Sequence, residues 1–127
     1  MSYSVELLKQ ADKDFSRLVK NNKKAWLLLT KAVQNLQSIE LDKALENQSV
    51  KILFGINKDT KKWLEKKKKE FLPTLFEYRD FPWSFPVRIV FAVNEKQKYI
   101  LIIEALHHKD MDQSKFMGSI SKRVRNV

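Results

Sequence analysis

Cysteine is absent from the 127 residues, which excludes disulfide bonds, thiolate zinc sites and a cysteine nucleophile. The longest apolar run is about eight residues, well short of the ~20 that a membrane-spanning helix needs. The first residues, MSYSVELLKQADKD, carry acidic side chains early and lack the apolar core of a signal peptide. Only two histidines occur, and they are adjacent, without carboxylates at the spacing of a metal site. We therefore expect a cytoplasmic protein without a metal or other cofactor.

The size and composition are those of one folded unit. A chain of 127 residues with 43% hydrophobic and 11% aromatic residues is globular rather than disordered. At this length, folding buries roughly two-thirds of the surface of the unfolded chain, enough for one core without disulfides or metals. We expect a single domain over residues 1–127.

Basic residues outnumber acidic ones, with 25 Lys and Arg against 15 Asp and Glu, a formal net charge of +10. Such a field attracts polyanions and speeds their capture. RNA, DNA, an anionic membrane and an acidic protein are all compatible partners. Nucleic acid ranks ahead of a membrane, because no amphipathic tail gathers the cations for insertion into lipid.

The N-terminal half has one strand pattern followed by two helix patterns. The alternation of SYSVELL (2–8) predicts a strand. Apolar residues share one helical face within 9–22, and KKAWLLLTKAVQNL (23–36) keeps the helical period for three turns. The two helices are separated only by Asn21 and Asn22, which predicts a helical hairpin.

The middle and the C-terminal end add further elements. Residues 41–55 predict a helix ending near Gln48 and a strand over 49–54, closed by Gly55. Residues 60–72 predict a helix that Pro73 terminates, because the residue before proline avoids the helical region. The tail predicts a short helix with one apolar stripe and a basic outer side, formed by Phe116, Met117, Ile120 and Val124 and by Lys122, Arg123 and Arg125.

Three β-rich runs follow one another at 74–80, 87–93 and 99–107. NEKQK between the last two suits a hairpin turn, and FPWSFP (81–86) is an aromatic connection bounded by prolines. Helices early and strands late favour an α+β fold, in which the N-terminal helical hairpin packs on one face of a small twisted, mainly antiparallel sheet.

Strand alternation predicts which side chains share a face of this sheet. The core side holds Val87, Ile89, Phe91 and Val93, with Phe76 and Tyr78 on the neighbouring strand. If helices cover that side alone, the other side stays open. The open side then carries polar residues of three strands, namely Glu77, Arg79, Arg88, Glu104 and His108. His107 falls on the core side if the strand stays regular to its end.

This set suits chemistry on a phosphodiester. Cleavage of RNA by internal attack needs a base for the 2′-hydroxyl, cations for the charge on phosphorus and an acid for the 5′-oxygen. Arginine holds phosphate bidentately, and histidine transfers protons near neutral pH. The same residues also fit cross-strand ion pairs without any catalytic role, and residue types alone leave both interpretations open.

Two further features have alternative interpretations. The run Lys66–Lys69 is either a solvated helix face or a contact for RNA, since its like charges repel and Glu65 and Glu70 offset them only in part. Four aromatic residues either stack on bases or close a core edge or partner interface, namely Trp63, Phe81, Trp83 and Phe85.

The motifs LFEYRD, VRIVFAV and YILIIEALHHKD resemble the RelE/ParE superfamily of toxins from bacterial toxin–antitoxin pairs. SYSVELL and ADKDFSRL are similar to the first strand and helix of that family, so the resemblance covers residues 1–55 and 74–112. It implies a compact toxin with a helical hairpin on a twisted antiparallel sheet, and a small cognate antitoxin as partner. RelE-like members cut mRNA on the ribosome, whereas ParE-like members inhibit DNA gyrase and are not nucleases.

The resemblance also implies roles for individual residues. Arg88 matches the arginine that opens the central strand and helps to hold the scissile phosphate, and Arg79 matches a basic residue of the preceding strand. His107 or His108, followed by Lys109, matches the position of an arginine or histidine that contacts the phosphate or the leaving group.

The sequence departs from the family in two places. RelE has lysines on the strand that matches 74–80, where this chain has Leu75 and Glu77, so that Glu77 is a candidate base. The lysine-rich segment 56–73 is longer than usual and would supply RNA contacts through Lys66–Lys69. The sequence analysis favours a ribosome-dependent mRNA endonuclease, with a non-catalytic, gyrase-inhibiting toxin as the alternative.

Overall fold

The structure, a computed structural model, describes residues 2–111 and 113–125, with only the backbone of 113–117. Within these residues the chain forms five α-helices, five strands and one short 3-10 helix. Their order is β1 (Ser4–Leu7), α1 (Lys9–Val19), α2 (Lys23–Gln37), α3 (Leu41–Glu46), β2 (Val50–Gly55), α4 (Lys58–Lys67), β3 (Thr74–Tyr78), β4 (Val87–Asn94), β5 (Tyr99–His107), η1 (His108–Asp110) and α5 (Gln113–Arg125). None of the described helices is long and apolar enough to cross a membrane.

The predicted helical hairpin of α1 and α2 is confirmed. Asn21 has a φ of 57°, a left-handed conformation that asparagine tolerates, and it reverses the chain between the helices. The side chain of Asn22 then caps α2, because its Oδ1 accepts a hydrogen bond of 3.0 Å from the backbone N–H of Ala25. The helix buries one apolar stripe and leaves Trp26 and Leu27 exposed.

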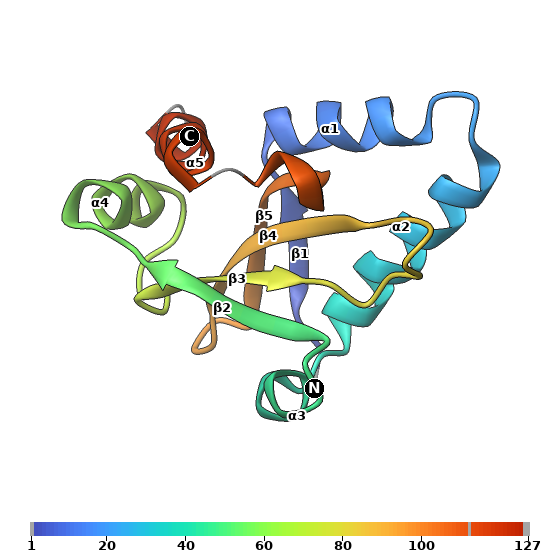
Figure 1. The fold of residues 1–127 in the computed structure, drawn as a ribbon. Helices are drawn as coiled ribbons and strands as arrows, with labels where there is room; N and C mark the ends of the chain where they lie inside the picture. Colours follow the sequence, from blue (N-terminus) through green and yellow to red (C-terminus); the bar gives the residue numbers. More distant parts are fainter. Residues whose placement is uncertain (1, 112, 126–127) are drawn as a thin grey trace.

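The five strands form one sheet in the order β1-β5-β4-β3-β2. β1 pairs with β5 in parallel, and the other three pairs are antiparallel. The strands twist strongly between the hairpin of α1 and α2 on one side and α4 and α5 on the other (Figure 1). The predicted α+β class and mainly antiparallel sheet are therefore confirmed.

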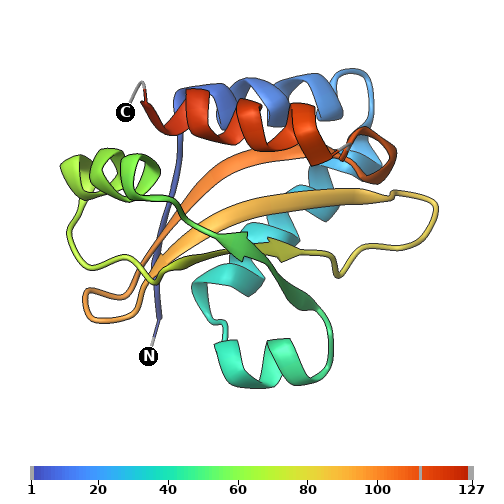
Figure 2. The ribbon, with the colours of Figure 1, turned by 60° about the vertical axis from the view of Figure 1, so that its left-hand side comes forward.

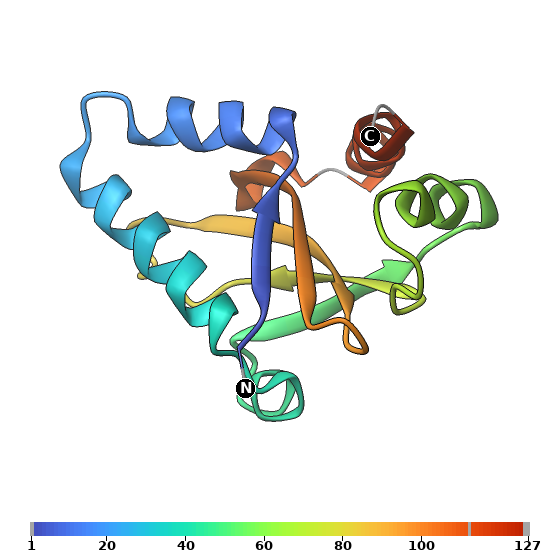
Figure 3. The same cartoon turned by 180° about the vertical axis from the view of Figure 1, so that it is seen from behind.

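The expectation that one side of the sheet stays open is wrong. On one side, Asn35 of α2 donates a hydrogen bond of 2.8 Å to the hydroxyl of Tyr78 in β3. On the other side, Ser119 of α5 donates to the carboxylate of Glu104 in β5 at 3.4 Å. Helices thus flank the sheet on both sides, as the views from the side and from behind show (Figures 2 and 3).

Apolar residues on both sides of β4 explain this second cover. Val90 and Ala92 lie on the side of Arg88, and both are fully buried. A strand that is apolar on both sides needs cover on both sides, as in buried sheets generally. α5 provides that cover with the buried residues Ile120 and Val124. The side chains of Phe116 and Met117, expected in the same stripe, lie outside the described residues.

The lysine-rich helix differs from its predicted range of 60–72, because α4 ends at Lys67. The next residue, Lys68, is extended, and Glu70 has a φ of 69°. Phe71 is buried, and the backbone N–H of Leu72 donates to the carbonyl of Val93 in β4 at 2.7 Å. Repulsion among successive lysines and this strand-like pairing both favour an early end of the helix.

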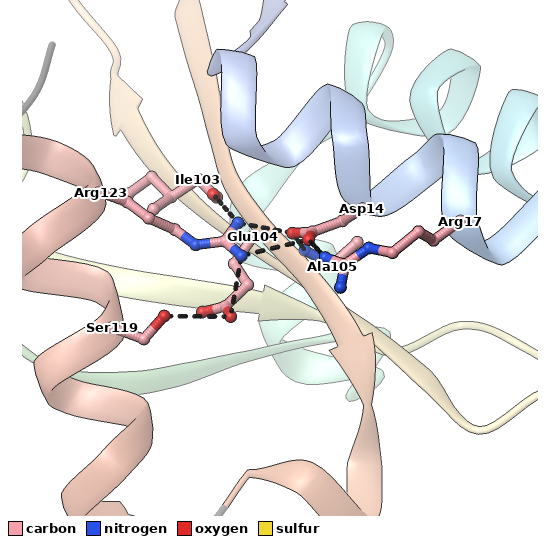
Figure 4. Close-up of polar contacts among 7 residues, drawn as sticks. All are labelled: Asp14, Arg17, Ile103, Glu104, Ala105, Ser119 and Arg123. Atoms are coloured by element: carbon pink, nitrogen blue, oxygen red, sulfur yellow. Dashed lines mark hydrogen bonds and ion pairs between the residues drawn. The ribbon is translucent and has the colours of Figure 1, made fainter.

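β1 covers only part of the edge of β5, and two side chains complete it. The register of the pair ends at Leu7 opposite Ile102. Beyond that point, the carboxylate of Asp14 accepts a hydrogen bond of 3.1 Å from the N–H of Ala105. The guanidinium of Arg123 donates to the carbonyl of Ile103, also at 3.1 Å (Figure 4).

Asp14 and Arg123 also bind each other. Arg123 donates two hydrogen bonds to the carboxylate of Asp14, at 2.5 and 3.1 Å, and Arg17 donates a further one. The side chain of Asp14 is 2% exposed and that of Arg123 is 14% exposed. Arg123 therefore points inward, and its prediction on the outer side of the C-terminal helix is wrong.

We predict that Asp14→Ala destabilises the protein by about 3 kcal/mol or more, because it leaves a buried guanidinium and a strand N–H without their partner. Urea unfolding followed by circular dichroism measures the change. Glu40→Ala removes an exposed ion pair with Lys43 and serves as the control, with an expected change within about 0.5 kcal/mol. Equal effects of the two substitutions would contradict the prediction.

Candidate functional site

Arg88 lies at the start of β4, where β3 ends. Its guanidinium is half-buried, and Nη1 donates to the carbonyl of Val87 at 3.0 Å. Its Nε is buried and has no hydrogen-bond partner within the described residues. Burial lowers the pKa of Arg88, the carboxylate of Glu77 opposes this shift, and the nearby charge of Arg79 adds to it. Arg88, Glu77 and Arg79 thus lie within electrostatic reach of one another, as the sequence predicted for one face of the sheet.

Glu77 and Arg79 come from the strand beside Arg88. Glu77 is 6% exposed and pairs in register with Val90 of β4 and Lys51 of β2. Arg79 follows the last residue of β3, and its N–H donates to the carbonyl of Ser49 at 2.9 Å. Lys51 thus lies opposite Glu77 in the register of the strands, and Arg79 and Arg88 lie within electrostatic reach at the same end of the sheet.

The two histidines lie at the same end of the sheet. His107 pairs in register with Val87, and the N–H of His108 donates to the carbonyl of Pro86 at 2.7 Å. His108 begins the 3-10 helix, where it and Lys109 are exposed. Alternation places the side chain of His107 on the opposite face from that of Leu106, which pairs with Arg88. The backbone positions of the predicted site are therefore close together, and His107 points away from Arg88.

His107 instead lines an open cleft of about 450 Å³ between α1, the end of β5 and α5. Its Nδ1 is buried and has no partner among the described residues. Arg17 and Arg123 line the same cleft, together with Glu104. With Asp14 and Asp110 also in its lining, the cleft combines an imidazole, two guanidinium groups and three carboxyl groups.

Glu104 is a buried and only partly paired carboxyl group of the cleft. Its Oε1 contacts Ser119 and Arg123, each at 3.4 Å, and its Oε2 is buried without a partner in the described residues (Figure 4). Burial raises the pKa of Glu104, whereas the charge of Arg123 lowers it and that of Asp14 raises it further. A partly paired, buried carboxyl group with a raised pKa is a candidate for proton transfer.

Sequence reasoning placed Glu104 and His107 near the site but missed Asp14, Ser119 and Arg123. One signal was available for Asp14, which lies at helical spacing from the apolar residues Ala11 and Leu18. A charged residue on the apolar face of a helix indicates a buried partner. Ser119 and Arg123 become part of the cleft only because α5 packs against β5.

The four lysines at 66–69 do not form one face. Nζ of Lys67 lies 2.7 Å from the carboxylate of Glu6. Nζ of Lys68 lies 5.0 Å from the ring centroid of Tyr99, and the carbonyl of Lys69 accepts a hydrogen bond from Asn94. A basic face does occur along α4, whose exposed lysines include Lys58, Lys61, Lys62 and Lys66.

The four aromatic residues that were candidates for base stacking or for closing a core edge differ in their surroundings. Trp63 packs against the core, and Phe81 contacts both Tyr78 and Phe85 with ring centroids 5.3 and 5.4 Å apart. These residues close an edge of the core. Trp83 differs, because it is 91% exposed. Across residues 2–111 and 113–125, no group of three or more His, Asp or Glu side chains is placed to hold a metal ion.

No protein-family model matches the sequence, and no curated protein matches it. Among solved structures, the archaeal RelE–RelB complex from Pyrococcus horikoshii aligns with a TM-score of 0.49 and 20% identity, over 87% of this chain and 99% of the other. The toxin–antitoxin complex RelBE2 from Mycobacterium tuberculosis aligns with a TM-score of 0.46 and 15% identity, over 85% and 100%.

We predict that Glu104→Gln becomes progressively more stable than the wild type as the pH rises above about 4.5, the ordinary pKa of this carboxyl group. Because the pKa is raised on folding, the native state binds the proton more tightly than the unfolded chain. The wild type therefore loses stability as Glu104 ionises, and glutamine does not. Chemical unfolding at several pH values between about 4 and 8 measures the difference.

The same series with Glu40→Gln, at an exposed position, controls for a general effect of net charge. A stability advantage of Glu104→Gln that shrinks with rising pH would show that ionised Glu104 is stabilised by folding, contrary to the raised pKa.

Proposed function

We propose that this chain is the toxin of a type II toxin–antitoxin pair and that it cleaves mRNA on the ribosome. The observation that carries the proposal is the arrangement around Arg88, whose half-buried guanidinium lies beside Glu77 and Arg79 at the strand end next to His108. The sequence resemblance to RelE-like toxins supports it, because Arg88 matches the phosphate-binding arginine of that family.

The proposed chemistry is internal attack on RNA. The 2′-hydroxyl attacks phosphorus, the bond from phosphorus to the 5′-oxygen breaks, and Arg88 and Arg79 stabilise the negative charge on the phosphate oxygens. His108 is exposed and donates the proton that the leaving 5′-oxygen takes. Glu77 is nearly buried near Arg88. We therefore propose that it removes the proton of the 2′-hydroxyl through a bridging water molecule.

A small cognate antitoxin is the proposed protein partner. With a net charge of +10, the toxin favours an antitoxin with acidic side chains that neutralise its basic surface. The ribosome is the second proposed partner, because ribosomal RNA presents a dense array of phosphates to a basic protein. Lys66–Lys69 and Lys109, together with the exposed lysines along α4, are the proposed contacts to its backbone.

We expect Arg88→Ala and His108→Ala each to slow mRNA cleavage by about 100-fold or more, since each removes charge stabilisation or proton transfer in the transition state. Relief of growth arrest in cells, together with mapping of mRNA cleavage sites, measures the effect. Lys24→Ala is the control, because Lys24 is an exposed cation at the start of α2. Circular dichroism checks that both variants stay folded.

The alternative, a non-catalytic toxin that binds DNA gyrase, gives the opposite result. Arg88→Ala and His108→Ala would then leave growth arrest intact, and arrest would come with DNA damage signalling and without mRNA cleavage. That result would refute the nuclease proposal and its site.

The proposed contact of α4 with RNA predicts a change in salt dependence. Replacing Lys61, Lys62 and Lys66 together by glutamine should lower the slope of log affinity against log salt by about 2–3, since each lost phosphate contact contributes ~0.7–0.9. Filter binding of ribosomes or of structured ribosomal RNA fragments at several salt concentrations measures the slope.

Replacing Lys20, Lys23 and Lys24 by glutamine is the matched control, because it removes the same number of exposed charges from the other side of the sheet. Equal loss of slope in the two triple variants would indicate a general charge effect and would count against a specific contact at α4.

A further inference from the structure

Trp83 is held outward on a loop that is otherwise packed. Its side chain is 91% exposed, the largest exposed fraction among the big hydrophobic residues of the described chain. On either side of it, Phe81 and Phe85 contact each other with ring centroids 5.4 Å apart, and Phe81 contacts Tyr78 at 5.3 Å. The hydroxyl of Tyr78 is in turn bonded to α2 through Asn35. The loop is therefore anchored to the core while its tip faces solvent.

Backbone hydrogen bonds fix both ends of this loop. The N–H of Phe81 donates to the carbonyl of Arg79, and the N–H of Phe85 donates to the carbonyl of Pro82, both at 2.8 Å. Pro86 accepts the N–H of His108 at 2.7 Å. A Trp ring on such a support loses little conformational entropy when it binds a ligand, because its backbone is already ordered.

The surroundings of Trp83 are charged rather than apolar. Arg79 and Arg88 lie at the two ends of the loop, His108 bonds to Pro86 through its backbone N–H, and Lys109 follows His108. Two exposed acids, Asp80 and Asp110, lie in the same region, whereas residues 81–87 themselves carry no charge. One aromatic ring in a mostly cationic setting matches a nucleotide, which offers one planar base and one phosphate.

The small apolar surface of Trp83 also fits a nucleotide better than a protein partner. A stable protein interface buries about 800 Å² on each partner, around an apolar centre. A single Trp side chain provides at most about 250 Å². Stacking on one base needs only the face of one ring and contributes about 1–3 kcal/mol for each base.

We propose that Trp83 stacks on an unpaired base of RNA bound beside Arg88. This inference rests on the proposed function, and it specifies that the substrate is single-stranded at a position near the cleaved bond. Arg88 is five positions after Trp83 in the sequence, so their Cα atoms are at most ~18 Å apart even in a fully extended chain. The stacked base therefore belongs to the same short stretch of RNA as the phosphate at Arg88.

The test uses two fluorescein-labelled strands of about 12 nucleotides, within the range of known single-strand sites. One is oligoadenylate with 2′-methoxy groups, which cannot be cleaved by internal attack. The other is an abasic strand of the same length and charge. Fluorescence anisotropy at fixed salt measures the affinity of the wild type and of each variant.

We expect Trp83→Ala to weaken binding of the oligoadenylate by about 5- to 100-fold and to leave binding of the abasic strand unchanged. Trp83→Phe keeps an aromatic face and should restore most of the affinity. Trp26→Ala is the matched control, because Trp26 is 56% exposed and lies on α2. It should leave both affinities unchanged.

Three results would overturn the inference: a Trp83→Ala variant that binds oligoadenylate like the wild type, an equal loss for both strands, or a wild type that binds neither. If Trp83→Ala retains RNA binding but no longer causes growth arrest, Trp83 contacts a protein rather than RNA. The cleavage assay with Arg88→Ala is independent of this result. Arg88-dependent cleavage with unchanged RNA binding by Trp83→Ala would therefore refute stacking and leave the proposed function standing.

Discussion

The incomplete edge of β5 is the constraint on which the rest of the structure depends. β1 pairs with β5 only as far as Ile102, and the next backbone groups would be left without partners in a buried region. Asp14 accepts the N–H of Ala105, and Arg123 donates to the carbonyl of Ile103. Because these two side chains also bind each other, the same contacts that complete the sheet fix α5 against α1. The position of the cleft follows from that packing.

Burial of acidic groups shapes the outer surface of this basic chain. Asp14, Glu77 and Glu104 are all buried, and each lies near an arginine. The acidic groups of these residues are therefore withdrawn from the surface, while most lysines remain exposed. This exposure of lysines favours an anionic partner.

Most of the candidate residues lie at one end of the sheet, where β3 ends and β4 begins. Register places Val87 opposite His107, and a backbone hydrogen bond ties His108 to Pro86. Arg88, His108 and the loop bearing Trp83 are thus held together by main-chain pairing, which does not depend on their side chains. Substitution of any one of them leaves that main-chain pairing in place, so the three can be separated experimentally.

The sequence by itself determined the elements whose residues repeat with a clear period, namely the helical hairpin and the strands at 74–107. It also placed Arg88, Arg79 and Glu77 on one face of the sheet, but it did not decide that His107 points away from them. Local periodicity suffices there, because a helix stripe or strand alternation encodes which side is buried. Only the tertiary structure decided that α5 covers the supposedly open side, that Arg123 points inward to Asp14, and that α4 ends at Lys67. Those outcomes depend on unpaired backbone groups and apolar surface from distant segments, which a local pattern does not contain.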